Sequence, residues 1–283
     1  MFPWGQAGMT SPRLVVSVVV HRSPLPVLEK ALICLQVAGS KALDAGMVTG
    51  LQIVVVDNDS GPRYQQALEG LLHRLGHREV DLTLLRCADN LGYGQGHNQV
   101  GSGDDELRLI LNPDVFLEPD SLVRGLAFLQ CHPGVGLVVP RVVDASGRPE
   151  YLCKRYPGVL VLLLRGFAPA WIRDRFTKSL AVYEMRDLDW QRPRFDLDLV
   201  SGCCLLMRGS IWRAIGGFCP DYFLYFEDFD LAIRAGQQSI IAYVPEFEIT
   251  HLGGGAARKG WRHRWWFMCS AFRFFNRHGW KWC

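Results

Sequence analysis

Runs of β-branched and apolar residues recur along the first part of this 283-residue chain. The first run reads LVVSVVV, which is typical of a strand buried on both faces of a sheet. The expected strands are residues 14–20, 51–56, 80–85 and 107–111, and helical spacing of leucines marks residues 24–37 and 63–75 between them. Strands that alternate with helices predict an α/β fold with a mostly parallel central sheet and right-handed crossovers.

This regular alternation ends near residue 140. Residues 141–151 contain DASGRPE, a hairpin-type turn, and residues 158–194 mix charges and aromatics without a clear period. We expect the latter segment to be a variable excursion. The remaining expected elements are helices at residues 121–131, 209–215 and 227–235, and strands at residues 136–139, 199–207 and 239–244.

Composition is that of a folded cytoplasmic protein. Hydrophobic residues make up 49% of the chain and charged residues 21%, so disorder is not expected. Nine cysteines without C-x-x-C spacing fit packed, reduced thiols better than disulfides or a zinc site. The longest apolar run, near residues 159–164, is far shorter than the ~20 residues of a membrane-spanning helix, and no signal peptide is expected.

Polar side chains follow several of the expected strands. DNDS follows the second strand, DNLGYGQGHN the third and NPD the fourth. In sheets of this kind, ligands bind beyond the carboxyl ends of the strands. Each motif alone has a simpler explanation, because Asp57 is more often a helix cap and N-P-D more often a turn. Several of them at one edge predict a polar cleft with room for a metal ion and a phosphorylated ligand.

Three features of this cleft have two interpretations each. The glycines of NLGYGQGHN either let the backbone approach a nucleotide or make a flexible turn, since their spacing is not that of a dinucleotide-binding motif. Asp114 supplies one oxygen ligand, and Mg²⁺ often takes only one or two protein carboxylates. His251 could be a metal ligand, although a single histidine is more often packed in a core.

The segment YFLYFEDFDLAIR places acids among aromatic side chains. Adjacent helical residues point about 100° apart, so Glu227 and Asp228 cannot share one role. Asp230 and Arg234 are four residues apart and are expected to pair on the surface. One of the first two acids then faces inward, where aromatic walls would raise its pKa and suit it to accept a proton.

The ordered motifs VVVDNDS, NLGYGQGHN, LILNPDV, VSGCCLLMR, GGF, YFEDFDLAIR and THLGGG resemble those of family-2 glycosyltransferases, in particular bacterial O-antigen and cell-wall rhamnosyltransferases. The resemblance spans residues 15–255. It implies a GT-A fold over residues 10–256, with a Rossmann-like, mostly parallel central sheet flanked by helices. The implied nucleotide-binding half is residues 10–140, and the implied acceptor half is residues 141–256.

The resemblance also implies roles for individual residues. Asp228 would be the general base, and Glu227 would support it or bind acceptor. Asp114 would hold Mg²⁺ or Mn²⁺ as the last acid of a D-x-D motif, and His251 would touch the metal or the diphosphate. The implied donor-binding residues are Asp57, Asn58, Ser60, Asp89, Asn90, Gly92, Gly96, Asn98, Asn112, His251 and Arg258.

Two departures from the family pattern bear on these roles. Asn112 replaces the first acid of D-x-D, which weakens the expected metal site. GGGAARKG follows His251 where relatives often have a serine, so Arg258 either contacts the diphosphate or belongs to the tail.

The implied reaction is transfer of a sugar, with inversion, from a nucleotide diphosphate donor. The expected donor is dTDP-rhamnose or a related nucleotide-sugar, and the expected acceptor is a lipid-linked glycan of surface polysaccharide synthesis. One alternative is a non-catalytic nucleotide-sugar-binding protein, which Asn112 keeps open. Another is a sugar nucleotidyltransferase, which has a similar fold and metal requirement.

Residues 257–283 form a basic and aromatic tail, with seven Lys or Arg, no acid and five of the nine tryptophans. One interpretation is a helical segment that rests on an anionic membrane, at the inner face of the cell membrane. The other is a helix packed on the body of the protein with arginines at its rim. Nucleic-acid binding is not expected, because the basic residues gather at one end rather than along a groove.

Overall fold

The computed structural model describes residues 11–76, 80–101, 103, 106–195, 197–253 and 260–282. The strands are β1 (Arg13–Val20), β2 (Gly50–Asn58), β3 (Asp81–Cys87), β4 (Glu106–Leu111), β5 (Val115–Leu117), β6 (Val135–Val143), β7 (Pro149–Glu150), β8 (Cys153–Lys154), β9 (Leu199–Val200), β10 (Cys204–Arg208) and β11 (Ile240–His251). The helices are α1 (Leu25–Asp44), α2 (Pro62–Leu75), α3 (Tyr93–Asn98), α4 (Ser121–Cys131), α5 (Val159–Phe167), α6 (Ala170–Arg175), α7 (Thr177–Tyr183), α8 (Gly209–Ala214), α9 (Glu227–Gly236) and α10 (Trp261–His278).

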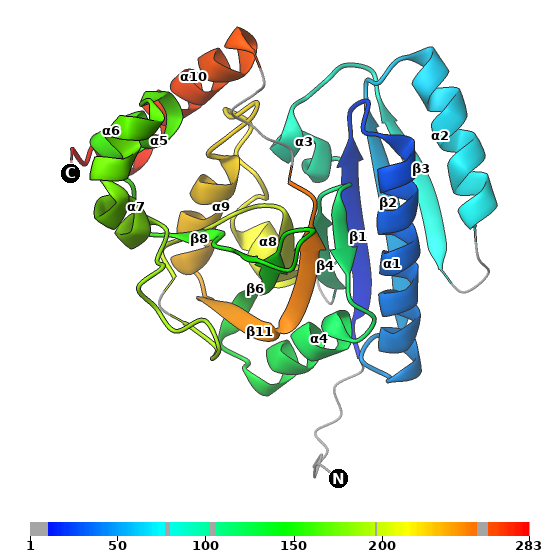
Figure 1. Cartoon of the computed structure of the whole chain (residues 1–283). Helices are drawn as coiled ribbons and strands as arrows, with labels where there is room; N and C mark the ends of the chain where they lie inside the picture. The colour runs from blue at the N-terminus through cyan, green and yellow to red at the C-terminus, as the bar shows by residue number, and fades with distance from the viewer. Residues whose placement is uncertain are drawn as a thin grey trace.

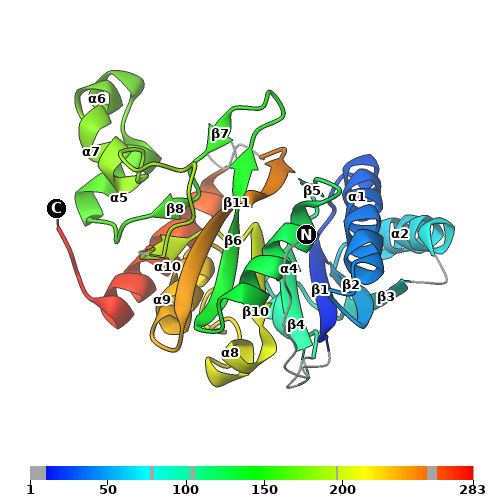
Figure 2. The same cartoon turned by 90° about the horizontal axis from the view of Figure 1, so that it is seen from below.

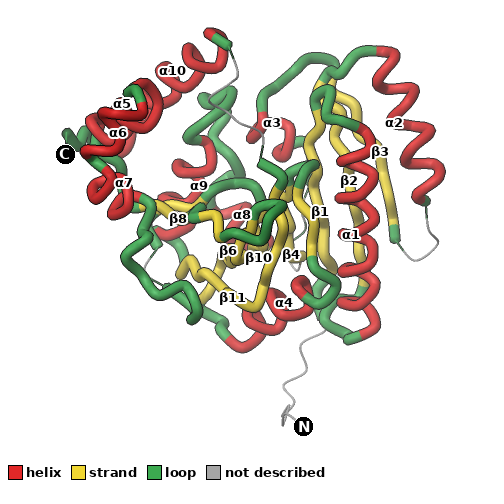
Figure 3. Tube along the Cα trace, in the orientation of Figure 1, coloured by secondary structure: helices red, strands yellow, loops and turns green. Residues whose placement is uncertain are grey.

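A single large sheet runs through the described part of the chain in the order β3-β2-β1-β4-β10-β6-β11-β5, and β7 pairs with β6 (Figures 1 and 3). The four strands from β3 to β4 are parallel, as the alternating pattern predicts. β10 inserts antiparallel between β4 and β6. The central sheet is therefore mixed, with its parallel half built from the first part of the chain.

Helices cover both faces of this sheet (Figure 2). On one face, α1, α2 and α4 bury Leu28, Leu68 and Leu126 in a core shared with Val16 of β1. On the other face, α8 and α9 pack against the sheet, and α3 covers β1 and β2. The continuous β-branched run of β1 follows from this layering, because both faces of the strand are buried.

The second half of the chain departs from two sequence-based expectations. Residues 199–207 do not form one strand, because a turn at residues 201–203 separates β9 from β10. The Gly202 N–H donates to Asp228 in this turn instead of joining a ladder (3.0 Å). Residues 158–194, for which the sequence predicts a variable excursion without a clear period, contain the short helices α5, α6 and α7.

The expected surface ion pair of Asp230 and Arg234 is in fact buried. Arg234 Nε lies 2.7 Å from Asp230 Oδ2, but the side chain of Asp230 is fully inaccessible. The C-terminal helix approaches the same carboxylate, with His278 Nε2 at 2.8 Å and Arg277 Nε at 3.4 Å. The Asp230 carboxylate therefore connects α9 to α10. Its burial is explained by α10, which is distant from it in the sequence.

The C-terminal helix packs on the body along one side. Phe274 and Phe275 are buried in a cluster with residues of α5, α7 and α9. Just beyond the helix, Val159 N–H donates to Lys281 O (2.8 Å), which ties the end of the described chain to the start of α5. The packing interpretation of the tail is correct for this side of the helix.

The opposite side of α10 is an exposed apolar stripe. It consists of Trp261, Trp265, Met268 and Phe272. Their spacing of four, three and four residues places them on one helical face. Membrane contact through this stripe therefore remains compatible with the packing of the other side. None of the described helices combines the length and the hydropathy needed to span a bilayer.

Truncation of Phe274 should show that α10 is part of the folded body. We expect Phe274→Ala to lower the free energy of unfolding by about 3–5 kcal/mol, because a fully buried ring leaves a cavity. Phe272→Ala is the matched control, since that ring is 58% exposed two residues away and its loss should change stability by less than about 0.5 kcal/mol. Urea unfolding of both variants measures the difference, and equal stabilities would contradict this packing.

Candidate functional site

The ends of β2 and β4 bring two polar segments to one edge of the sheet. β1 lies between them, with Val20 opposite Asp57 and Val18 opposite Leu111. Neighbouring strands are ~4.8 Å apart, so the two strand ends lie about 10 Å apart. The N-P-D turn follows Leu111 directly, which places Asp57 and Asp114 at the same edge.

Asn58 organises the loop on the β2 side of this edge. Its Oδ1 accepts a hydrogen bond from Leu91 N–H (2.8 Å). Its Nδ2 donates to Gly92 O (2.9 Å) and to Asn90 Oδ1 (3.1 Å). The amides of Asn58 and Asn90 are therefore engaged with the protein itself, and they hold the loop after β3 against β2.

Gly92 is required by the backbone of this loop. It has φ +82°, and a Cβ atom at this position would lie 2.0 Å from the carbonyl oxygen of Phe223. Tyr93 N–H donates to the same oxygen (3.0 Å). The glycine therefore permits a close approach to Phe223, in another segment of this chain. This contact brings the loop after β3 near the start of α9.

The other expected donor-binding residues occupy varied settings. Gly96 is buried in α3, and Asn98 holds both backbone groups of Phe218, at 2.8 and 2.9 Å. Ser60 Oγ accepts from the backbone N–H of Arg22 (2.9 Å). Asp89 is exposed at the end of β3, and Arg258 lies outside the described residues.

Asp57 has one oxygen in use and one without a partner. Its Oδ1 accepts from Ser60 N–H (3.1 Å). Its Oδ2 is buried and has no hydrogen-bond partner in the described part of the chain. Leaving a carboxylate oxygen unpaired costs free energy, which a donor group at this end of β2 would recover.

His251 lies between two carboxylates at the end of β11. Its Nε2 is 3.6 Å from Asp114 Oδ1, and its Nδ1 is 3.0 Å from Glu150 Oε2. Burial lowers the pKa of His251, but the hydrogen bonds and charges of Asp114 and Glu150 outweigh it, so the pKa is raised. Nothing in the sequence marks Glu150, which enters the site because β7 pairs with β6.

These side chains do not make a metal site by themselves. No group of three or more His, Cys, Asp or Glu within the described ranges is arranged to hold an ion. Asp114 and His251 together fit an ion that takes its remaining ligands from phosphate oxygens, as Mg²⁺ commonly does. Asn112 contributes no charge, and its Oδ1 is buried without a partner among the described residues.

Asp228 and Glu227 begin helix α9. Asp228 Oδ2 accepts from Gly202 N–H (3.0 Å), and its Oδ1 accepts from Phe229 N–H (2.9 Å). Burial raises the pKa of Asp228 to about 6 although these hydrogen bonds oppose the rise. Burial and the neighbouring charge of Asp228 also raise the pKa of Glu227. Desolvation thus raises the pKa of both adjacent acids, a perturbation that often marks functional sites.

The backbone before these acids is strained. Tyr225 and Phe226 have φ of 70° and 64°, a left-handed conformation that bulky residues rarely adopt. The ring of Phe226 is held 5.2 Å from the ring of Phe267 and 5.2 Å from that of Phe274, both on α10. Such strain persists where surrounding packing enforces it, so α10 helps to set the orientation of the acids.

The turn at residues 201–203 joins the two regions, because Cys203 O accepts a hydrogen bond from Asn112 N–H (2.8 Å) and Gly202 N–H donates to Asp228 (3.0 Å). Burial raises the pKa of the Cys203 thiol, and the nearby charges of Asp114, Glu150 and Asp228 raise it further. The structure thus brings Asp114, His251 and Asp228 together, and it places Asp57 at the same sheet edge on the far side of β1.

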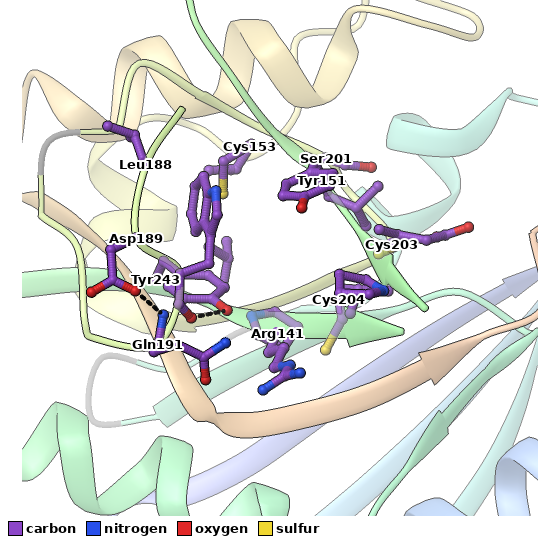
Figure 4. Close-up of a pocket in the computed structure, with 18 residues that line it drawn as sticks. Arg141, Tyr151, Cys153, Leu188, Asp189, Gln191, Ser201, Cys203, Cys204 and Tyr243 are labelled. Carbon is purple, nitrogen blue, oxygen red and sulfur yellow. Dashed lines mark hydrogen bonds between the residues drawn. The ribbon is translucent and has the colours of Figure 1, made fainter. Parts of the chain in front are cut away.

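A cavity of about 250 Å³ adjoins this centre (Figure 4). Tyr151 and Ser201 lie on one side of it and Arg141 and Gln191 on the other, and Glu150 and Cys203 also line it. Residues 188–191 come from the segment that the sequence marks as variable. The lining combines aromatic faces with charged and polar groups, as sites for small polar ligands do.

Comparison with known proteins identifies the family. No family model matches the chain. The chain is 30% identical over 253 residues to the N-acetylglucosaminyl-diphospho-decaprenol L-rhamnosyltransferase of Mycobacterium tuberculosis, which covers 83% of this chain and 74% of that protein. The chain belongs to the family-2 glycosyltransferases. This glycosyltransferase is also 26% identical over 201 residues to rhamnosyltransferase WbbL of Escherichia coli, across 65% of this chain and 71% of WbbL.

Solved structures confirm the expected GT-A fold of the glycosyltransferase. A mannosyltransferase of Pyrobaculum calidifontis, solved with GDP-Man and Mn²⁺, matches 98% of this chain and 68% of its own with a TM-score of 0.60 at 19% identity. TarS of Staphylococcus aureus, residues 1–349, matches 94% of this chain and 71% of its own with a TM-score of 0.53 at 15% identity.

Proposed function

We propose that this glycosyltransferase moves rhamnose from dTDP-rhamnose, with inversion at the anomeric carbon, to a hydroxyl of a lipid-linked glycan in surface polysaccharide synthesis. The observation that supports this most is the relationship to the M. tuberculosis enzyme, whose name specifies rhamnose and an acceptor sugar on a decaprenyl diphosphate. A second relative is also a rhamnosyltransferase.

In this proposal the donor lies along the sheet edge between Asp57 and Asp114. The nucleoside meets Asp57, Asp89 and the loop of Asn90 and Gly92, where the unpaired Oδ2 of Asp57 accepts a hydrogen bond. The diphosphate then reaches Asp114 across the end of β1. The span of about 10 Å between the two strand ends suits a nucleotide diphosphate sugar.

Mg²⁺ or Mn²⁺ is the proposed cofactor. Asp114 and His251 would hold the ion, which needs further ligands from the donor diphosphate because Asn112 supplies no charge. A bound ion would neutralise charge on the departing nucleoside diphosphate. The solved mannosyltransferase contains Mn²⁺, which supports this assignment.

Asp228 is the proposed general base. Its carboxylate accepts the proton of the acceptor hydroxyl while that oxygen bonds to the anomeric carbon, and the bond from this carbon to the nucleoside diphosphate breaks. Attack opposite the leaving group inverts the anomeric configuration. A pKa of about 6 leaves Asp228 ionised at neutral pH yet basic enough to take the proton. Glu227 supports Asp228 in this role. The acceptor sugar enters the cavity beside Tyr151.

Product analysis tests the reaction class. We expect the full chain, given dTDP-rhamnose, Mn²⁺ and N-acetylglucosaminyl diphosphate on a short prenyl chain, to release one dTDP for each rhamnosylated acceptor. EDTA should lower this rate at least about tenfold if the ion stabilises the leaving group. Mass spectrometry and NMR identify the product and its anomeric configuration. Release of pyrophosphate would instead indicate a nucleotidyltransferase, and binding without any product would indicate a non-catalytic protein.

Substitution of the base gives a second test. Asp228→Asn should lower kcat by about 10²–10⁴-fold with little change in dTDP affinity, because only proton transfer is lost. The wild-type rate should fall about tenfold per pH unit below pH 6, since protonated Asp228 cannot accept a proton. Asp81→Asn, an exposed acid at the start of β3, is the control with unchanged rate. Full turnover by Asp228→Asn would reject the assignment.

We also propose that the exposed stripe of α10 rests on an anionic membrane. Exposed apolar side chains continue beyond the stripe, because the ring of Phe272 lies 5.7 Å from that of Trp280, which lies 5.9 Å from that of Trp282. Further exposed apolar side chains lie within residues 159–183, which contain α5, α6 and α7: Leu160, Leu163, Trp171, Phe176 and Val182. Residues 260–282 contain five Lys or Arg and no acid, a charge that complements anionic headgroups. A lipid-linked acceptor would be met at such a surface.

Vesicle sedimentation tests this contact with the full chain, because truncating α10 would remove the buried Phe274. Trp265→Ser with Phe272→Ser should reduce pelleting on anionic vesicles at least about tenfold, since each buried ring contributes ~1.5–3 kcal/mol. Val37→Ser, an exposed apolar residue of α1, is the control and should pellet like wild type. Equal pelleting of the double variant and wild type would remove the membrane proposal.

A further inference from the structure

A cluster of three cations surrounds one carboxylate next to the cavity. Lys154 Nζ lies 3.8 Å and Arg165 Nε 3.7 Å from Glu184 Oε1. Arg186 lies 2.5 Å from Glu184 Oε2. The cluster therefore has three positive charges and one negative charge. Its net charge stays positive when the Asp228 carboxylate is included.

The members of this cluster differ in accessibility. Lys154 is buried, and its Nζ also donates to the carbonyl of Tyr151. Arg165 and Arg186 remain 49% and 53% exposed. Burial lowers the pKa of Lys154 to about 8, although the charge of Glu184 opposes this. A buried cation lies here beside two accessible guanidinium groups. An anion that binds from solvent would stabilise the positive charge of this cluster.

The cluster adjoins the proposed base. Lys154 of β8 pairs with Leu199 of β9, and the turn after β9 contains Gly202, which donates to Asp228. The charge of Arg165 is close enough to Asp228 to lower its pKa against the effect of burial. The cations thus lie within reach of a molecule whose hydroxyl meets Asp228.

The cluster also adjoins the exposed apolar surface. Arg165 follows Leu160 and Leu163 on α5, and both leucines are exposed. Leu160 N–H donates to Trp282 O (3.3 Å), so the apolar surface continues into the last described residues of the chain. Base, cations and apolar surface therefore follow one another across this end of the molecule.

We propose that Arg165 and Arg186, supported by the charge of Lys154, bind the diphosphate of the lipid-linked acceptor. This inference rests on the proposed function. The acceptor has a sugar, a diphosphate and a prenyl chain in that order, and the molecule presents a base, a cationic cluster and an apolar surface in the same order. Each guanidinium group can donate two parallel hydrogen bonds to the oxygens of one phosphate. Two arginines therefore suit the two phosphates of a diphosphate. The donor also contains a diphosphate, but in the proposed function that group lies at Asp114.

The test compares two acceptors and two pairs of substitutions. One acceptor is N-acetylglucosaminyl diphosphate on a short prenyl chain, and the other is a neutral alkyl glycoside of N-acetylglucosamine. Arg165→Gln with Arg186→Gln should raise KM for the diphosphate acceptor at least about tenfold and leave KM for the glycoside and for dTDP-rhamnose within about twofold. Arg13→Gln with Arg74→Gln is the matched control, because both arginines are exposed and ion-paired far from the cluster.

A binding measurement provides a readout independent of turnover. Calorimetry with a short prenyl diphosphate, in the presence of saturating dTDP to fill the donor site, should give at least about tenfold weaker affinity for the double variant than for wild type. A KM increase shared equally by both acceptors, or confined to dTDP-rhamnose, would overturn the proposal. If wild type rhamnosylates neither acceptor, the proposed function fails. Independently of that result, equal affinities of wild type and the double variant for prenyl diphosphate would reject the role of the cluster.

Discussion

The parallel register of β2, β1 and β4 is the constraint on which the site depends. Because β1 pairs with both neighbours along its length, the chain must leave β2 and β4 at the same edge of the sheet. This places Asp57 and the Asn112–Asp114 turn on either side of one strand. The remaining functional groups reach that edge from the second half of the chain, through β11 and the turn before β10.

Two carboxylates on α9 connect this edge to the rest of the molecule. Asp228 accepts from the Gly202 turn, and Asp230 binds Arg234 together with Arg277 and His278. Breaking the second set would leave an uncompensated buried charge, which commonly costs about 3–5 kcal/mol. The C-terminal helix is therefore joined to α9 by buried charges and is not an appendage, even though its outer side is apolar and exposed.

The sequence predicted the parts of this arrangement that depend on local pattern. The β-branched run of β1 and the leucine spacing of α1 led to the correct elements, because burial on both faces or on one stripe leaves a direct periodic signal. Asp114 lies 3.6 Å from His251, and the turn that contains Gly202 holds Asp228. The residue roles and the boundaries of the two halves remain predictions.

Other features depend on contacts between distant segments, and these the sequence could not reveal. The burial of Asp230 requires α10, and the entry of Glu150 into the site requires the pairing of β7 with β6. The charged residues of the cluster around Glu184 are spread over 33 positions, from Lys154 to Arg186, with no shared period. Only the folding of α5 and α7 over β8 brings them together.

The two-sided character of α10 has a geometric consequence. An α-helix with its side chains is ~10–12 Å across, so a membrane touched by the outer stripe would lie roughly one helix diameter from the inner residues that pack against the Phe226 ring. Glu227 and Asp228 follow that ring directly. The reacting hydroxyl would then be held at a set height above the headgroups, which favours the sugars nearest the lipid and excludes the distal residues of a long chain. The thickness of one helix would then determine the position along a glycan at which the next sugar is added.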